Sequence, residues 1–130
     1  MKVIEWKDEF SVGDPLMDAH HQQFLNMVHG LDRDVSTGQR DVDKEAVLVF
    51  LIEYIDMHLR SEERLMVRIG FPEAKAHEAI HHEFENRILE IEQAFKKDSS
   101  SLRLKDLFEL AQEWWVGHIL KEDKKYKPYI

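Results

Sequence analysis

Residues 77–95 read HEAIHHEFENRILEIEQAF, and their apolar residues recur at the spacing of one helix face. Steps of three and four residues join six positions on one helix face, namely His77, His81, Phe84, Ile88, Ile91 and Phe95. This face is apolar over most of its length and changes to histidine at its N-terminal end. The next question is whether other helical segments of the chain also change from apolar residues to histidine at one end.

Three other segments show the same change from an apolar face to a histidine-bearing one. Residues 18–37 and 102–123 each place one histidine on the face, and residues 43–69 place a histidine and an acid four residues apart. The predicted core positions are His21, Phe24, Val28, Leu31 and Val35 in the first segment, Val47, Leu51, Tyr54 or Ile55, His58, Glu62, Met66 and Ile69 in the second, and Leu104, Leu107, Ala111, Trp114 and His118 in the last.

Turn-forming residues separate the four segments. Gly38 and Gly70 suit left-handed helix ends. Asp18 is the expected cap of the first helix, with Asp14 before Pro15 as an alternative start. Because the connections are short, consecutive helices should be antiparallel, and we predict an all-α, up-down-up-down four-helix bundle. The predicted single domain, residues 1–130, has an extended arm over 1–17, helices over about 18–37, 43–69, 73–97 and 102–123, and a tail over 124–130.

The composition narrows the classes of partner and site. The formal net charge of -8 argues against nucleic acid and anionic membranes, which bind basic surfaces. With no cysteine in the chain, any metal must be held by histidine nitrogens and carboxylate oxygens. Charges interrupt every apolar run, so we expect no membrane insertion. A cytoplasmic monomer is the expected state.

Antiparallel packing would bring the histidine-bearing ends of the four helices to one end of the bundle. Five histidines and at least one carboxylate would then share one layer of the core. Burying such groups without partners costs on the order of several kcal/mol. A hydrogen-bonded polar network is one answer, but divalent iron, manganese, cobalt or zinc satisfies imidazole and carboxylate directly. The number of these side chains exceeds the four ligands of one tetrahedral zinc, which favours two metal ions bridged by acidic side chains.

Helical spacing places the remaining histidines outside this set, but two acids after His118, Glu122 and Asp123, compete for the last position in it. His20, His29 and His82 each lie one residue from a core position, which turns them about 100° away from the predicted face. Glu122 lies four residues after His118 on the same face. Asp123, five residues on, should point about 140° away in a regular helix. Spacing alone favours Glu122.

Taken together, these residues resemble the hemerythrin family over essentially the whole chain, and a stand-alone chain of this length is most similar to the bacteriohemerythrins. The matching stretches are FSVG at 10–13, DAHHQQF at 18–24, HLRSEE at 58–63, HEAIHHEF at 77–84 and HILKEDKKY at 118–126. In the family pattern an aspartate follows the last histidine by five residues, which selects Asp123. That choice requires a π-type or frayed turn between residues 118 and 123. The family commonly has glutamine where this chain has His20, and the register of the first segment favours His21.

The resemblance implies a non-haem di-iron centre with Fe2+/Fe3+ ions joined by an oxo or hydroxo bridge. It implies that one iron takes His77, His81 and His118, that the other takes His21 and His58, and that Glu62 and Asp123 bridge them. The iron with two histidines is left one ligand short, and dioxygen is the ligand implied for that vacancy.

The implied function is reversible dioxygen binding for storage, transport or delivery to an oxygen-using enzyme, without catalysis. A di-iron oxidase or peroxidase is an alternative, although ferritin-like oxidases favour a carboxylate-rich shell and this set is rich in histidine. A sensor of oxygen, nitric oxide or iron is another alternative. The lysines that could dock a partner, or merely compensate a helix C-terminus, are Lys121, Lys124, Lys125 and Lys127.

Overall fold

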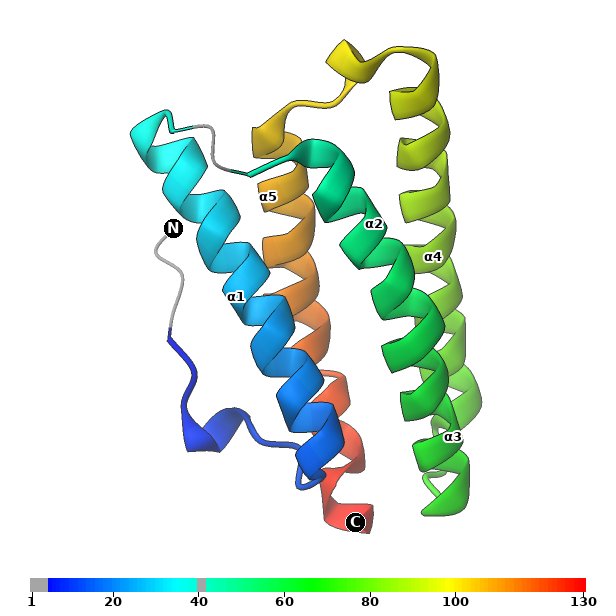
Figure 1. The fold of residues 1–130 in the computed structure, drawn as a ribbon. Coiled ribbons are helices and arrows are strands. Elements are labelled where there is room, and N and C mark those ends of the chain that lie inside the picture. The colour runs from blue at the N-terminus through cyan, green and yellow to red at the C-terminus, as the bar shows by residue number, and fades with distance from the viewer. Residues whose placement is uncertain (1–4, 40–41) are drawn as a thin grey trace. The chain divides into compact units, whose positions relative to one another are not determined.

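A computed structural model describes residues 5–39 and 42–130, and it confirms the predicted all-α four-helix class (Figure 1). Residues 1–4 of the expected arm and 40–41 of the expected first loop lie outside the described residues. Within the described part, every regular element is a helix, and none is long and apolar enough to cross a membrane. The long segments are α1 (Pro15–Thr37), α2 (Lys44–Tyr54) with η2 (Ile55–Leu59) and α3 (Arg60–Arg68), α4 (Ala74–Lys97), and α5 (Leu104–Trp114) with η4 (Trp115–Ile119). Three short 3-10 helices are η1 (Asp8–Phe10), η3 (Ser99–Ser101) and η5 (Asp123–Tyr129).

The chain forms two compact units, each built on an antiparallel pair of helices. The first unit comprises Met1–Asp43 and Leu104–Ile130, and in it α1 packs along α5 and η4. The second unit comprises Lys44–Arg103, and in it α2, η2 and α3 pack against α4. Within each pair the two helices run in opposite directions (Figure 1). Each unit therefore brings together two segments whose histidine-bearing ends lie on the same side.

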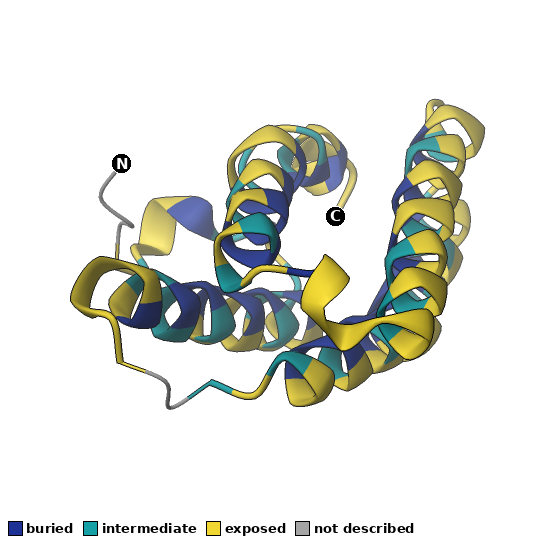
Figure 2. Ribbon diagram, turned by 90° about the horizontal axis from the view of Figure 1, so that it is seen from above, coloured by how far each residue is buried: buried dark blue, intermediate teal, exposed yellow. Residues whose placement is uncertain are grey.

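The buried faces follow the periodicity of the sequence, as the dark blue stripes along the helices show (Figure 2). In α1 the residues His21, Phe24, Val28 and Leu31 are buried as predicted. Val35 was predicted in the core, but this was wrong, because it is 37% exposed near the end of the helix. The neighbouring acid Asp34 is buried instead, and one of its oxygens accepts a hydrogen bond from the Val42 N–H at 2.7 Å.

The start of α1 corrects the expected cap. Asp14 has extended backbone angles, and its side chain accepts a hydrogen bond from the Met17 N–H at 3.0 Å, which makes it the N-cap. Pro15 occupies the first helical position, where its fixed φ suits the helix and its missing N–H costs nothing. Asp18 lies inside the helix and accepts hydrogen bonds from the Ser11 hydroxyl and the Val12 N–H, so it fastens the N-terminal arm.

Two π-helical turns, η2 and η4, interrupt the long helices without breaking them. Residues on both sides of each turn keep right-handed helical angles. An extra residue in a helical turn shifts the phase of the side chains, so neighbouring residues can both face inward. Tyr54 and Ile55 are accordingly both buried, which explains why the sequence did not distinguish between them. Trp114 and Trp115 are buried together for the same reason.

The η4 turn bears on the irregularity predicted near His118. The Leu120 N–H donates to the Trp115 carbonyl at 2.9 Å, which is the i→i+5 bond expected of a π turn. The turn begins at Trp115, before the predicted range, and beyond it the Lys121 N–H donates to the His118 carbonyl at 3.3 Å. The backbone then continues into η5 at Asp123, so the fourth helix ends earlier than predicted, and residues expected in a tail are helical. The η2 turn around His58 was not predicted.

We predict that Asp14→Ala destabilises the protein by about 1 kcal/mol, because it removes the acceptor for an N–H at the start of α1. Asp14→Ser should retain most of the stability, since serine also caps helices. Urea unfolding followed by circular dichroism measures both variants. Equal stability of the alanine variant and the wild-type protein would show that this cap does not hold the helix start.

Candidate metal centre

In the first unit, three buried side chains from α1, η4 and η5 meet around one carboxylate. Asp123 lies with one oxygen, Oδ2, 3.1 Å from His21 Nε2 and the other, Oδ1, 2.8 Å from His118 Nε2. All three residues are buried, and Asp123 and His21 are fully so. These residues form the first donor group. Asp123 reaches His118 because the regular helix has ended before residue 123.

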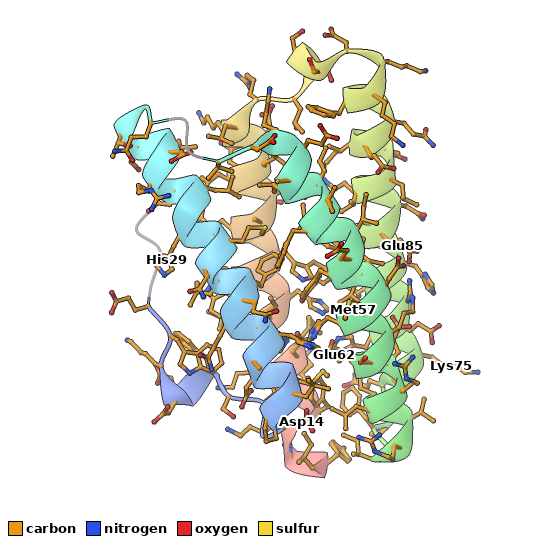
Figure 3. The ribbon with its side chains drawn as sticks, viewed as in Figure 1. Asp14, His29, Met57, Glu62, Lys75 and Glu85 are labelled. Carbon is orange, nitrogen blue, oxygen red and sulfur yellow. The ribbon has the colours of Figure 1, made fainter. Side chains whose placement is uncertain are left out.

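In the second unit, four buried side chains from η2, α3 and α4 meet around a second carboxylate, that of Glu62. Glu62 is labelled in Figure 3. Glu62 Oε1 lies 3.3 Å from His77 Nε2 and 3.1 Å from His81 Nε2, and its Oε2 lies 3.5 Å from His58 Nε2. One donor atom each from Glu62, His77 and His81 lies within 4.8 Å of the others, a spacing that suits metal binding. These four residues form the second donor group.

Both donor groups divide the two oxygens of a carboxylate between different histidines. In the second group, Oε1 faces the His77 and His81 pair of α4, whereas Oε2 faces His58 of η2. In the first group, Oδ1 faces His118 and Oδ2 faces His21. A carboxylate that turns each oxygen towards a separate imidazole has the arrangement needed to bridge two cations. Simple one-to-one pairing of acid with histidine would not require it.

The donor chemistry fits metal ions of the first transition row. Imidazole nitrogen and carboxylate oxygen suit iron, zinc and manganese, and no thiolate is present in the chain. Ligands about 2.1 Å from one ion and at right angles to each other lie about 3 Å apart. The nitrogen-to-oxygen distances of 2.8–3.3 Å around His118, His21, His81 and His77 agree with that value. These four histidines are therefore placed as neighbouring ligands would be, whereas His58 lies slightly farther from its oxygen, at 3.5 Å.

Other candidate residues lie away from these groups. His20 and His29 are half-buried and His82 is exposed, whereas the five histidines of the donor groups are all buried. Glu122, which helical spacing favoured, is only half-buried, and it pairs with Lys125 at 2.9 Å. The structure thus brings Asp123 rather than Glu122 to His118, and the reason is the irregular backbone that a regular helical projection cannot represent.

Comparison with known proteins assigns the chain to a family. A model of the hemerythrin HHE cation binding domain matches residues 12–130. The chain belongs to the hemerythrin family. A bacteriohemerythrin of Methylococcus capsulatus is 30% identical over 132 residues, covering 100% of this chain and 98% of the relative. One from Stenotrophomonas maltophilia is 27% identical, covering 100% of this chain and 83% of the relative. A hemerythrin-like protein of Naegleria gruberi is 23% identical, covering 95% and 91% respectively.

Aromatic side chains support the histidines of this hemerythrin. The rings of Trp114 and His118 stack with centroids 3.8 Å apart and an interplanar angle of 11°. The rings of Tyr54 and His58 stack at 4.6 Å and 21°. The two residues of each pair are four apart, a spacing that places their side chains on one helix face, and each histidine lies within a π turn. Trp115 instead packs edge-on against Phe10 at 5.8 Å, which fixes the arm.

Glu63 is a polar neighbour of the second donor group that the sequence analysis missed. One oxygen of Glu63 lies 2.8 Å from His81 Nδ1, and both oxygens accept hydrogen bonds from Arg60 at 2.7 Å. Burial acts to raise the pKa of Glu63, but the bonds from His81 and Arg60 outweigh it and hold the pKa below its usual 4.5. The spacing of Arg60 and Glu63, three residues apart on one helix, was the available signal.

Acidification of the metal-free hemerythrin should reveal this interaction. Because the pKa of Glu63 is lowered by folding, its carboxylate stabilises the fold at neutral pH, and that contribution is lost as the pH falls from about 4.5 through the lower folded-state value. We predict that Glu63→Gln, measured by urea unfolding with a chelator present, shows a shallower loss of stability over this range. Glu78→Gln, which changes an exposed carboxylate, should keep the wild-type slope. Parallel profiles for all three proteins would contradict the prediction.

Proposed function

We propose that this hemerythrin binds dioxygen reversibly at a non-haem di-iron centre formed by the two donor groups. In this proposal His77, His81 and His118 hold one iron, His21 and His58 hold the other, and Glu62 and Asp123 bridge them. The observation that carries the proposal is the division of each carboxylate between two sets of histidines. Glu62 Oε1 and Asp123 Oδ1 face the histidines assigned to one iron, and Glu62 Oε2 and Asp123 Oδ2 face those assigned to the other.

The two irons would supply the electrons for reversible dioxygen binding. The chain's own residues supply the ligands and the surroundings. Neutral imidazoles and two carboxylates offset part of the cationic charge, and their burial keeps bulk water and reductants away. Stacking of Trp114 on His118 and of Tyr54 on His58 limits rotation of two ligand rings. A fixed, shielded set of ligands favours release of an intact gas molecule over its further reduction.

Membership of the hemerythrin family supports a di-iron protein, and the finer assignments are part of the proposal. Oxygen storage, transport or delivery to an oxygen-using enzyme is the role we assign, and we retain the cytoplasm and the monomeric state as predictions. Of the lysines considered for docking, Lys125 pairs with Glu122, and Lys124 bonds to the Glu9 carbonyl. Those two side chains serve contacts within the chain, which weakens the case for a docking patch there.

Repeated oxygenation separates a carrier from an enzyme. The purified iron-loaded protein is reduced without air, exposed to oxygen and then sparged with argon. A carrier should show a visible charge-transfer band that appears with oxygen and disappears with argon over several cycles. Irreversible conversion to ferric protein, with consumption of added peroxide, would instead identify an oxidase or peroxidase.

Single substitutions test the ligand assignment. We expect His77→Ala and Asp123→Asn to lower bound iron well below about two ions per chain, because the first removes a ligand and the second replaces a bridging carboxylate with a neutral amide that offers one oxygen. The matched controls are His29→Ala, which changes a half-buried histidine outside the donor groups, and Glu122→Gln, the neighbouring acid. Both controls should keep the wild-type iron content, measured by elemental analysis of folded protein. Equal iron in all four variants would refute the assignment.

A further inference from the structure

His81, one of the two histidines of α4 that face Glu62, has a second acid on the other side of its ring. His81 Nε2 lies 3.1 Å from Glu62 Oε1, and His81 Nδ1 lies 2.8 Å from Glu63 Oε2. An ionised carboxylate only accepts hydrogen bonds, so the Glu63 contact requires a proton on Nδ1. A neutral imidazole with its proton on Nδ1 presents the lone pair of Nε2, the nitrogen that faces the donor group.

Glu63 is itself held in place by a second layer of contacts. Arg60, one turn earlier on α3, donates from Nη1 to both oxygens of Glu63 at 2.7 Å. Its other terminal nitrogen, Nη2, pairs with Glu85 of α4. The guanidinium group therefore links the carboxylates of two helices in the same unit. The Glu63 side chain is only 13% exposed, so little freedom remains for it to leave His81.

We propose that Glu63, clamped by Arg60 and Glu85, is a positioning residue that holds His81 as the Nδ1–H tautomer and aims its Nε2 at the metal. This inference rests on the proposed function, because it concerns a ligand of the proposed centre. Glu63 binds no metal itself. Its role is to fix the ring and make the ligating nitrogen a better donor, as carboxylates behind metal-bound histidines commonly do. Glu62 and Glu63, adjacent in sequence, thus serve one histidine from its two sides.

A neighbouring acid supplies a matched control. Glu63 and Glu78 both line an open groove of about 460 Å³, together with Arg60, Arg64, Val67 and Arg68. Glu78 is exposed, and its contact with His82 at 3.4 Å involves a histidine outside the donor groups. Replacing Glu78 changes the charge of the same groove without touching His81. If metal binding weakens when Glu63 is replaced but not when Glu78 is replaced, the cause is the lost contact with His81 and not the changed charge of the groove.

The experiment measures cobalt(II) binding to the metal-free protein by competition with a chelator. We expect Glu63→Ala to bind about 10–100-fold more weakly than wild type. Glu63→Gln should recover most of that loss, because its amide oxygen still accepts the Nδ1 proton. Glu78→Ala should bind like wild type. Cobalt(II) spectra of the Glu63→Ala protein should also change, since a loosened imidazole alters the ligand field.

The outcomes distinguish this inference from the proposed function. Failure of the wild-type chain to bind cobalt(II) or iron(II) would overturn both. Wild-type binding with an unchanged Glu63→Ala affinity, or with equal losses in the alanine and glutamine variants, would overturn the inference alone. Should Glu63→Ala not fold, the nitrogen NMR spectrum of the zinc-loaded wild-type protein decides the matter. An Nδ1 proton of His81 that is held in a hydrogen bond, and whose shift changes in Glu63→Gln, supports the inference, whereas an Nδ1 proton that exchanges freely with solvent or is unaffected by Glu63→Gln overturns it.

Discussion

Two fully buried carboxylates, Glu62 and Asp123, each turn their two oxygens towards different imidazoles, and the design of both helical units depends on satisfying them. An ionised carboxylate in an apolar interior is costly unless its oxygens are paired or bound to a cation. Each helix pair must therefore deliver histidines to two sides of its carboxylate. This requirement explains why helix faces that are otherwise apolar change to histidine near the same end of each unit.

The π turns η2 and η4 show how the helices meet that requirement. Each turn contains one of the donor histidines, His58 or His118, and each is preceded by a buried aromatic that stacks on that histidine. A regular helix presents one narrow face, whereas an added residue lets two neighbouring positions point inward. The π turns thus bury a second side chain, Ile55 or Trp115, beside the aromatic, Tyr54 or Trp114, that stacks on the ligand four residues later. The irregular backbone therefore coincides with two of the donor histidines, His58 and His118.

Beside the second donor group lies an outer layer of partly exposed residues. Glu85 pairs with Arg60, Arg60 pairs with Glu63, and Glu63 contacts the ring of the fully buried His81. Burial acts to lower the pKa of His81, but its bonds to Glu62 and Glu63 outweigh burial and raise that pKa above the usual 6.5 in the metal-free chain. A metal ion competes with the proton for Nε2, whereas Glu63 contacts Nδ1, so the proposed centre and the outer layer act on the two nitrogens of one ring.

Helical periodicity is set by local backbone geometry, so the amino-acid pattern was enough to predict the helical class, most of the inward faces, and the burial of five histidines and Glu62. It also excluded His20, His29 and His82 by the same rule. The fold was needed to show that α1 starts at Pro15, that a π turn surrounds His58 and that Glu63 supports His81. Helical spacing favoured Glu122 over Asp123, the family resemblance selected Asp123, and the structure places Asp123 against His118. These features depend on breaks in periodicity and on contacts between distant residues. His21 and Asp123 stand at opposite ends of the chain, and no local pattern encodes their meeting.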